Sequence, residues 1–168
     1  MPKDHTVLII AQRFYKIDVV SFDPKKFDKS TFTNQPYIKR VEKPWGYELH
    51  FVPEDKPYMG KVIHIKKGAR LSLQIHDRKQ ESWIIIKGHA KVIWDNNQGK
   101  LIETELPKGQ GFTTEIGQRH RLVGITDCDI IEVSTPEIGT TYRLEDDYKR
   151  PHETEGMRKL KNRGWKKS

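Results

Sequence analysis

From Tyr37 onward, the chain is a succession of short apolar segments, each ended by glycine, proline or another turn-forming residue. Segments of roughly four to eight residues are typical of β-strands, and no stretch between them has convincing helical spacing. Asp95-Asn96-Asn97-Gln98-Gly99 is a strong hairpin signal between two such segments. The predicted strands cover residues 47–52, 59–66, 71–76, 82–87, 90–94, 101–106, 111–114, 119–125, 130–134 and 140–144. This pattern predicts an all-β fold, an antiparallel sandwich or barrel.

The chain divides into three regions. Its 168 residues are enough for one domain with a hydrophobic core. Residues 1–36 are interpreted as an N-terminal extension, in which 6–11 and 18–22 have the pattern of short strands. Residues 37–150 are the predicted barrel, and residues 151–168 are a basic tail that carries most of the net charge of +8.

The composition also limits the partners of the chain. The basic tail favours a solvated, mobile terminus over a tether for nucleic acid or anionic membranes. No apolar segment approaches the length of a membrane span. The single cysteine, Cys128, excludes an intrachain disulfide and lies beside two acids that disfavour a thiolate. These features predict a soluble, cytoplasmic protein with no membrane partner, and they do not favour nucleic acid.

The segment from Arg70 to His76 alternates polar and apolar side chains. Residues two apart share one face of a strand. The polar residues of this segment are therefore expected to face a cavity together: Arg70, Ser72, Gln74 and His76. The apolar residues, beginning with Leu71, are expected to pack on the opposite side. Four polar side chains on one buried face need partners, which a cavity holding an ion and a polar ligand supplies.

Two later residues complete a candidate metal site. Glu81 begins the next predicted strand, and a tight return would bring it beside His76. His120 opens a later strand that would lie across the barrel. Gln74, His76, Glu81 and His120 would then surround one divalent ion: Zn²⁺, Mn²⁺, Fe²⁺, Co²⁺ or Ni²⁺. The alternative is that Gln74 and His76 are exposed strand positions and Glu81 is an ordinary loop acid.

These residues belong to longer motifs. Gly68 to Trp83 resembles the first cupin motif, with Gln74 in place of its first histidine, as in phosphomannose isomerases, and Gly111 to His120 resembles the second. Further matching segments are Lys43-Pro44-Trp45-Gly46-Tyr47-Glu48, His120-Arg121-Leu122, Ile131-Glu132-Val133 and Arg143-Leu144-Glu145-Asp146-Asp147-Tyr148. The chain thus resembles the C-terminal isomerase domain of bifunctional type II enzymes, which join mannose-6-phosphate isomerase to mannose-1-phosphate guanylyltransferase.

The resemblance implies a cupin barrel, that is, a double-stranded β-helix or jelly roll, with one divalent metal as cofactor. It also implies isomerisation of mannose 6-phosphate to fructose 6-phosphate, or of a related sugar phosphate. Three departures leave the exact sugar open: Asp77 and Arg78 follow His76 where the family has further histidines, Glu115-Ile116-Gly117 replaces a segment with proline, and Lys149 replaces a glycine. No glycine-rich phosphate loop is visible, so guanylyltransferase activity is not implied.

Aldose–ketose isomerisation moves a proton between C1 and C2, and a divalent metal stabilises the charge that develops on oxygen. Arg70 is the first candidate to bind the phosphate of the substrate, because it is expected on the cavity face. Glu132, Arg143 and Lys61 are the predicted catalytic residues. Glu132 lies between two apolar residues and is expected to be either a general acid/base with a raised pKa or a salt-bridge partner.

Trp45 and Tyr47 are candidates for an aromatic wall against the sugar, although core packing is the commoner fate of such residues. Arg121 follows the ligand His120 and is expected to point outward. Barrel edge strands need covering, which favours a homodimer. Because a fold does not determine a function, two alternatives stay open: another metal-dependent cupin enzyme, such as an Fe²⁺ dioxygenase, and a non-catalytic cupin that binds a sugar.

Overall fold

The computed structural model describes residues 27–166, and the chain divides into two compact units, residues 1–35 and 36–168. In the first unit, the described residues contain one short 3-10 helix, η2 (Lys29–Thr31). Asp28 caps this helix, because its Oδ1 accepts hydrogen bonds from the backbone N–H and the hydroxyl of Ser30 at 2.9 and 2.7 Å. The predicted strands at 6–11 and 18–22 lie outside the described residues.

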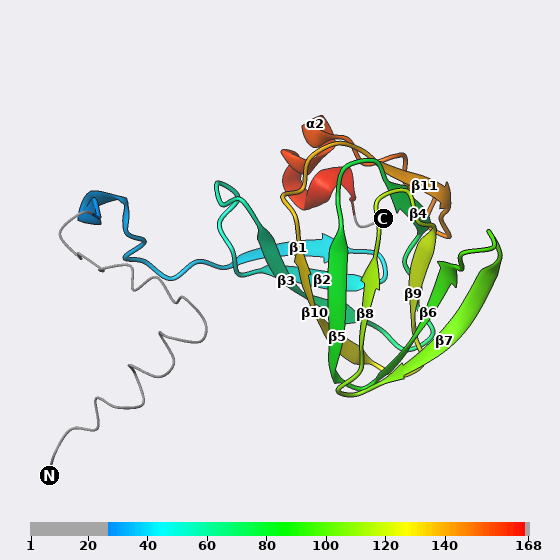
Figure 1. The fold of residues 1–168 in the computed structure, drawn as a ribbon. Coiled ribbons are helices and arrows are strands. Elements are labelled where there is room, and N and C mark those ends of the chain that lie inside the picture. The colour runs from blue at the N-terminus through cyan, green and yellow to red at the C-terminus, as the bar shows by residue number, and fades with distance from the viewer. Residues whose placement is uncertain (1–26, 167–168) are drawn as a thin grey trace, which may run out of the picture. The chain divides into compact units, whose positions relative to one another are not determined.

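The second unit is built from β-strands, as the sequence predicts (Figure 1). The strands are β1 (Lys39–Lys43), β2 (Gly46–His50), β3 (Met59–Ile65), β4 (Leu73–His76), β5 (Glu81–Lys87), β6 (His89–Asp95), β7 (Leu101–Pro107), β8 (Gly111–Thr114), β9 (His120–Gly124), β10 (Cys128–Ser134) and β11 (Thr141–Glu145). They form two antiparallel sheets, one of order β1-β2-β3-β10-β5-β8 and one of order β11-β4-β9-β6-β7.

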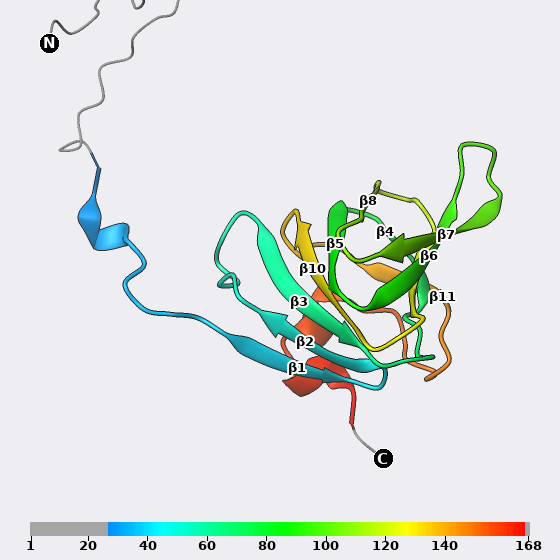
Figure 2. The ribbon, with the colours of Figure 1, turned by 90° about the horizontal axis from the view of Figure 1, so that it is seen from below.

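The chain passes repeatedly between the two sheets, so strands far apart in sequence become neighbours. β10 lies between β3 and β5, and β9 lies between β4 and β6. Figure 2 shows the two sheets on opposite sides of a common interior. This arrangement brings residues from the first and last thirds of the barrel sequence to one place, which local sequence patterns do not reveal.

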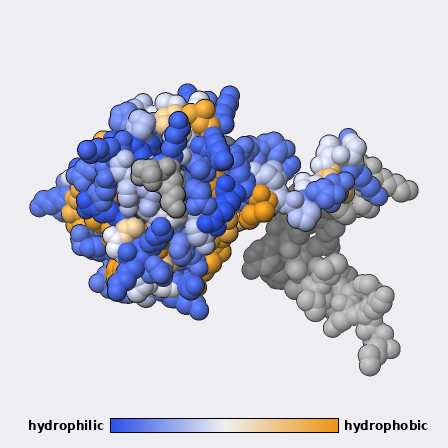
Figure 3. All heavy atoms as spheres, turned by 180° about the vertical axis from the view of Figure 1, so that it is seen from behind, coloured by the Kyte–Doolittle hydropathy of each residue, from blue (hydrophilic) through white to orange (hydrophobic). Residues whose placement is uncertain are grey.

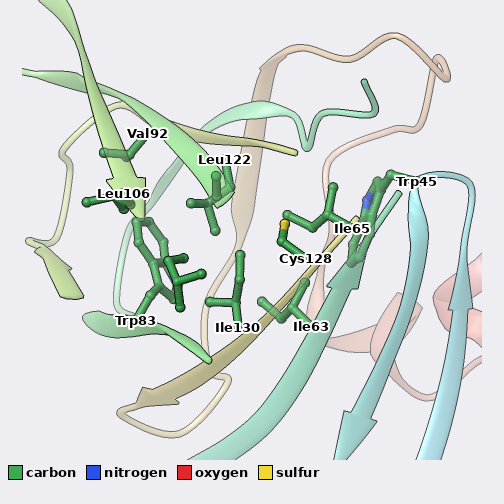
Figure 4. Packing of buried hydrophobic residues seen from close by; sticks show 11 residues of the cluster. Trp45, Ile63, Ile65, Trp83, Val92, Leu106, Leu122, Cys128 and Ile130 are labelled. Atoms are coloured by element: carbon green, nitrogen blue, oxygen red, sulfur yellow. The ribbon is translucent and has the colours of Figure 1, made fainter. Parts of the chain in front are cut away.

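Apolar side chains from both sheets meet in this interior (Figure 4). Strand alternation sets which residues point inward. On β10, Cys128, Ile130 and Glu132 are buried in turn, while the residues between them lie on the outer face. On β3, Ile63 and Ile65 point inward in the same way. Each large apolar side chain that is fully buried stabilises the fold by roughly 1.5–3 kcal/mol.

The strand bounds differ from the prediction at two places that matter for the site. β1 was not among the predicted strands, and it forms the edge of the larger sheet by pairing with β2. The strand predicted at 71–76 begins only at Leu73. The two residues before it, Leu71 and Ser72, are not in regular strand conformation, so strict alternation does not reach back to Arg70.

The prediction of a solvated tail from residue 151 is wrong in part, because Glu153 and Arg163 are buried, although most of residues 151–166 are exposed. Glu153 forms a β-bridge with Thr141, with N–H···O distances of 3.0 and 2.9 Å. A one-turn helix, α2 (Glu155–Arg158), and a 3-10 turn, η3 (Lys161–Gly164), follow. Arg163 is only 8% exposed, because its guanidinium pairs with Glu137 in the connection between β10 and β11 and with buried Glu153. We refer to residues 153–164 as the C-terminal segment.

The outer surface is mostly polar. Figure 3 shows one face of the barrel unit, where hydrophilic side chains predominate and apolar side chains form scattered patches. Among residues 27–166, no helix has the length and apolarity that a membrane crossing requires. The expected homodimer stays a prediction.

Candidate metal centre

Side chains from three strands converge in the barrel interior. Gln74 on β4 pairs in register with His120 on β9, and His76 is the last residue of β4. Glu81 begins β5 in the other sheet, with Oε1 3.1 Å from His120 Nε2 and Oε2 3.4 Å from His76 Nε2. The ligand atoms of the two histidines and Glu81 all lie within 4.8 Å of one another. Within residues 27–166 this is the one such group of histidine, cysteine and acidic side chains.

The two imidazole rings are oriented through their other nitrogen atoms. His120 Nδ1 lies 2.9 Å from the backbone oxygen of Gln118, which can only accept, so this nitrogen carries the proton. His76 Nδ1 lies 3.0 Å from Thr141 Oγ1. With Nδ1 protonated, a neutral His120 ring presents the lone pair of its Nε2 toward Glu81, whereas Thr141 Oγ1 can donate or accept and so orients the His76 ring in either tautomer. Burial, followed by the charge of Lys79, lowers the pKa of His76 to about 4, so its ring is uncharged near neutral pH. Metal binding needs such oriented, deprotonated nitrogens.

The donor set and its spacing fit a divalent ion. A nitrogen lone pair and a carboxylate oxygen 3.1 Å apart repel each other unless a cation lies between them. Ligands about 2.1 Å from one ion lie about 3.0 to 3.4 Å apart in octahedral or tetrahedral geometry, which the two Glu81–histidine separations match. Glu81 Oε2 is buried and forms an ion pair with Lys79, but it accepts no hydrogen bond. A metal ion would satisfy this oxygen.

Gln74 lies between the two histidines. Its Nε2 is 3.3 Å from His76 Nε2 and 3.2 Å from His120 Nε2, while its Oε1 accepts a hydrogen bond of 2.7 Å from Ser72 Oγ. The two amide atoms differ little in shape, and a half-turn of the amide would place the oxygen between the imidazoles. The Ser72 hydroxyl can accept as well as donate, so it would still pair with the turned amide. Gln74 therefore suits the role of an oxygen ligand.

A cavity of about 50 Å³ adjoins these side chains. Its wall includes charged residues from both sheets and from the C-terminal segment: Lys43, Glu48, Lys61, Lys79, Glu81, Glu132, Glu137, Arg143, Glu153, Arg158 and Arg163. Glu132 on β10 pairs in register with Lys61 on β3. The ammonium groups of Lys61 and Lys79 both contact Glu132 Oε1, at 3.4 and 3.1 Å.

Glu132 has both features that the sequence offered as alternatives, salt bridges and a raised pKa. It forms salt bridges with two lysines, and burial together with the charge of Glu81 raises its pKa despite them. For Lys61, burial alone would lower the pKa, but the surrounding carboxylates of Glu132, Glu48 and Glu137 outweigh it and raise the pKa. The lysine is therefore charged, and the carboxyl that it contacts has an increased affinity for a proton.

Arg70 lies outside this cavity, contrary to the prediction. Its Nε and Nη2 donate to the Asp147 carboxylate at 2.6 and 2.8 Å, and 43% of its side chain is exposed. The reason is the late start of β4, because alternation fails between Arg70 and Leu73. Leu71, expected to point away, lines the cavity instead.

The other predicted residues divide between the cavity and the surface. Trp45, Lys61 and Arg143 line the cavity, as predicted. Trp45 is only 2% exposed. Tyr47 lies outside the cavity, because its ring stacks on His64 at 4.7 Å on the outer face of the sheet. Arg121, expected to point outward in a structural role, contributes to the lining of the cavity. It is buried and donates to the side chain and backbone oxygens of Glu145 at 3.1 and 3.0 Å.

Sequence reasoning missed several residues of the cavity wall. Lys79 lies in the connection between β4 and β5, and its spacing of two from Glu81 was the available signal that both share one side of an extended chain. Arg158 and Arg163 were assigned to a tail. Glu153 is close to both in sequence, but Glu137 is brought to Arg163 only by the tertiary fold.

The family model of the mannose-6-phosphate isomerase C-terminal domain matches residues 31–153. The chain belongs to this family. The alginate biosynthesis protein AlgA of Pseudomonas aeruginosa is 35% identical over 118 residues, which are 69% of this chain and 22% of that protein. Mannose-1-phosphate guanylyltransferase 2 of Escherichia coli O157:H7 is 30% identical over 118 residues, 68% of this chain and 22% of that protein. The chain therefore spans about a fifth of the length of these two relatives.

Solved structures support the fold. The oxalate decarboxylase of Lactobacillus farciminis matches with a TM-score of 0.58 and 20% identity, covering 68% of this chain and 37% of that one. KdgF from Halomonas sp. matches with a TM-score of 0.52 and 18% identity, covering 62% of this chain and 96% of that one. These likenesses show the fold alone. The predicted cupin barrel is confirmed, and this member of the mannose-6-phosphate isomerase C-terminal family has the same two-sheet architecture.

Proposed function

We propose that this protein is a metal-dependent aldose–ketose isomerase that interconverts mannose 6-phosphate and fructose 6-phosphate, or a related sugar phosphate pair. The observation that carries the proposal is one arrangement. Two histidines, Glu81 and Gln74 converge beside a cavity in which a second carboxyl, Glu132, has a raised pKa. Isomerisation needs an electrophile and a proton carrier side by side. Membership of an isomerase domain family supports the same reaction.

A divalent ion held by Gln74, His76, Glu81 and His120 would polarise the carbonyl oxygen of the sugar and stabilise the charge that develops there. Glu132 would remove the proton from C2 of the aldose and return it to C1, while the hydroxyl proton passes from O2 to O1. The raised pKa of Glu132 suits both halves of this transfer, because it increases the affinity of the carboxyl for the proton that it must accept and later return.

The two lysines would position Glu132. Lys61 and Lys79 approach the same oxygen, Oε1, from β3 and from the β4–β5 connection. Their contacts fix the orientation of the carboxyl while its other oxygen, Oε2, is the one that would transfer the proton. Lys79 also pairs with Glu81, so it links the carboxyl of the predicted metal site to the predicted base.

Turnover by the metal-loaded protein tests the proposal directly. Mannose 6-phosphate labelled with deuterium at C2 should yield fructose 6-phosphate with loss or transfer of the label, and a chelator should stop the reaction. Re-addition of Zn²⁺, Mn²⁺, Fe²⁺, Co²⁺ and Ni²⁺ in turn would identify the active metal. Glu132→Gln should lower kcat by about 10²- to 10⁴-fold without reducing metal affinity.

Glu105→Gln is the matched control, because Glu105 is exposed on β7 and pairs only with His89 among the described residues, at 3.2 Å. It should turn over like the unaltered protein. Sugar phosphate binding with no ketose and no exchange at C2 would instead support the non-catalytic cupin. Oxygen consumption with another substrate would support the dioxygenase.

A further inference from the structure

The carboxylate of Glu153 is surrounded by cations. Arg143 Nη2 lies 2.7 Å from its Oε2 and Arg163 Nη1 lies 2.8 Å from its Oε1. Arg158 Nε and Lys43 Nζ are 3.4 and 3.7 Å away. These four cations come from four elements, β1, β11, α2 and η3, and Glu153 itself is only 5% exposed. Two of these cations also pair with other carboxylates, Arg163 with Glu137 and Lys43 with Glu48, and Glu153 alone cannot neutralise all four.

Arg143 is not fully satisfied in this arrangement. Its side chain is 6% exposed, yet its Nε has no hydrogen-bond partner, and the nearest acid oxygen, on Asp146, is 4.0 Å away. An arginine fork has donors for a second acceptor beside the first. A buried donor without a partner is unfavourable, and a ligand with more acceptor oxygens than a carboxylate would satisfy it.

The same residues separate two cavities. The cavity of about 50 Å³ at the predicted metal site and an outer cavity of about 200 Å³ share Lys43, Arg143, Arg150, Glu153 and Arg163 as lining. The inner cavity has room for a few water molecules and not for a hexose phosphate. A ligand that reaches the metal from the outer cavity must therefore pass this wall.

The charges of the inner cavity also favour an anion. Arg121 and Arg150 pair with Glu145 and Asp146. The remaining lysine and arginine side chains of the lining are Lys43, Lys61, Lys79, Arg143, Arg158 and Arg163, and the carboxylates are Glu48, Glu81, Glu132, Glu137 and Glu153. The cations exceed the carboxylates by one, and a bound divalent metal would increase this excess.

We propose that Lys43, Arg143, Arg158 and Arg163 form the subsite for the phosphate group of the substrate, and that Glu153 occupies it until the phosphate displaces its carboxylate. This rests on the proposed function, since a phosphate monoester is the group that a sugar phosphate substrate brings. A phosphate dianion carries one more charge and one more free oxygen than a carboxylate, so it can engage the cations that Glu153 leaves only partly paired.

The exchange needs little movement of the barrel. The backbone of Glu153 is fixed by its bridge to Thr141, so only its side chain has to turn. Arg158 and Arg163 belong to the short C-terminal segment, which has no fully regular helix beyond one turn. Asn162 and Arg163 have positive φ angles of 49° and 52°, a conformation that non-glycine residues adopt only when their surroundings hold them there.

Binding of inorganic phosphate to the full metal-loaded chain, measured by calorimetry at constant ionic strength, tests the subsite. Arg163→Gln should weaken phosphate binding by about tenfold, as expected for loss of a charge-assisted contact. Glu153→Gln should strengthen it, because the competing carboxylate is gone. Arg119→Gln, at a surface ion pair with Asp95, is the matched control and should bind phosphate normally.

Two further measurements make the result independent of folding defects. The double variant Glu137→Gln with Arg163→Gln removes both partners of one buried ion pair, and it should show the same weakening. In the unaltered protein, phosphate should slow tryptic cleavage after Lys159 and Lys161, which are exposed in the C-terminal segment, relative to cleavage after exposed Lys100.

The proposal is overturned if phosphate affinity responds to neither Arg163→Gln nor Glu153→Gln, or if Arg70→Gln is the variant that loses phosphate. It is also overturned if phosphate binding disappears on chelation, because the ion would then be the only site. Phosphate binding with the expected variant pattern but no isomerase turnover would leave the subsite standing and reject the proposed reaction. Isomerase turnover, together with phosphate affinities that are the same in the variants and the unaltered protein, would support the proposed reaction and reject the subsite.

Discussion

The barrel interior has an apolar part and a polar part, and the same strands supply both. On β3, β5, β9 and β10, an apolar inward residue stands two positions from a charged or ligating one. These pairs are Ile63 and Lys61, Trp83 and Glu81, Leu122 and His120, and Ile130 and Glu132. On each strand, the apolar core and the polar site are therefore only two residues apart, at successive inward positions.

The two parts differ in what they contribute. Burial of the apolar side chains stabilises the fold. Burial of charged groups costs desolvation energy, which their mutual attraction offsets only in part, so a charged interior is weak evidence for stability. The polar part thus has the composition of a region kept for binding and chemistry. The two parts should respond differently to substitution, pH and metal.

The largest expected effect is a loss of stability from the apolar part. Ile65 is fully buried on β3, and Ile65→Ala should lower the free energy of unfolding by about 2–5 kcal/mol through lost burial and a residual cavity. Divalent metal affinity of the folded protein should not change. Urea denaturation and a metal titration would measure the two quantities. Ile86→Ala, at a 38% exposed position of β5, is the control and should change the stability by less than about 0.5 kcal/mol. A loss of metal affinity in Ile65→Ala would show that the two parts are not separable.

Acid should destabilise the metal-free protein through the polar part. The pKa of His76 is lowered to about 4 by burial and then by Lys79, whereas an unfolded histidine has a pKa of about 6.5. Between these values the unfolded chain binds a proton that the folded chain does not. Stability should therefore fall as pH decreases from about 6.5 to about 4, by about 3 kcal/mol from this residue. Urea unfolding at a series of pH values would measure it. His76→Gln should lose this part of the slope, and an unchanged slope would contradict the assignment.

A divalent metal should stabilise the fold through the polar part alone. At a free concentration of about a hundred times Kd, binding to the folded state adds about 2.7 kcal/mol. Excess chelator should remove this increment. His120→Ala and Gln74→Ala should lose most of it, because each removes a predicted ligand. Thermal unfolding with and without metal would measure it. An equal increment in His120→Ala would show that the ion binds elsewhere.

The comparison also explains what the sequence could reveal. Alternation and turn residues predicted the strands, and the family motifs predicted the cupin barrel. Parity placed Gln74 and His76 on one face, a tight return was expected to add Glu81 and a later strand to add His120, and the structure brings these side chains together. Parity failed for Arg70, because it holds only inside a regular strand and β4 starts three residues later.

The charged residues of the cavity wall could not be predicted from the sequence for a different reason. Glu137, Glu153 and Arg163 lie far from the predicted ligands in sequence, and each occupies a loop or a short turn without periodicity. A cluster of lysine and arginine at a chain end is usually solvated. The bridge between Thr141 and Glu153 and the ion pair of Arg163 with Glu137 hold that end against the barrel, and neither kind of contact leaves a pattern in the sequence.

The smallest expected effect concerns ion pairs outside the barrel interior. Lys91 on β6 donates to Glu103 on β7 at 2.7 Å, and both side chains are partly exposed. A double-mutant cycle with Lys91→Gln and Glu103→Gln should give a coupling energy of about 0.2–1 kcal/mol, since solvent screens the charges. Added salt should reduce it further. The same cycle on Lys79 and Glu132, whose charges are buried, should give a larger coupling that salt hardly changes. Equal, salt-sensitive couplings at the two sites would mean that water screens the interior charges as well. The polar part of the interior would then behave electrostatically like the exposed surface.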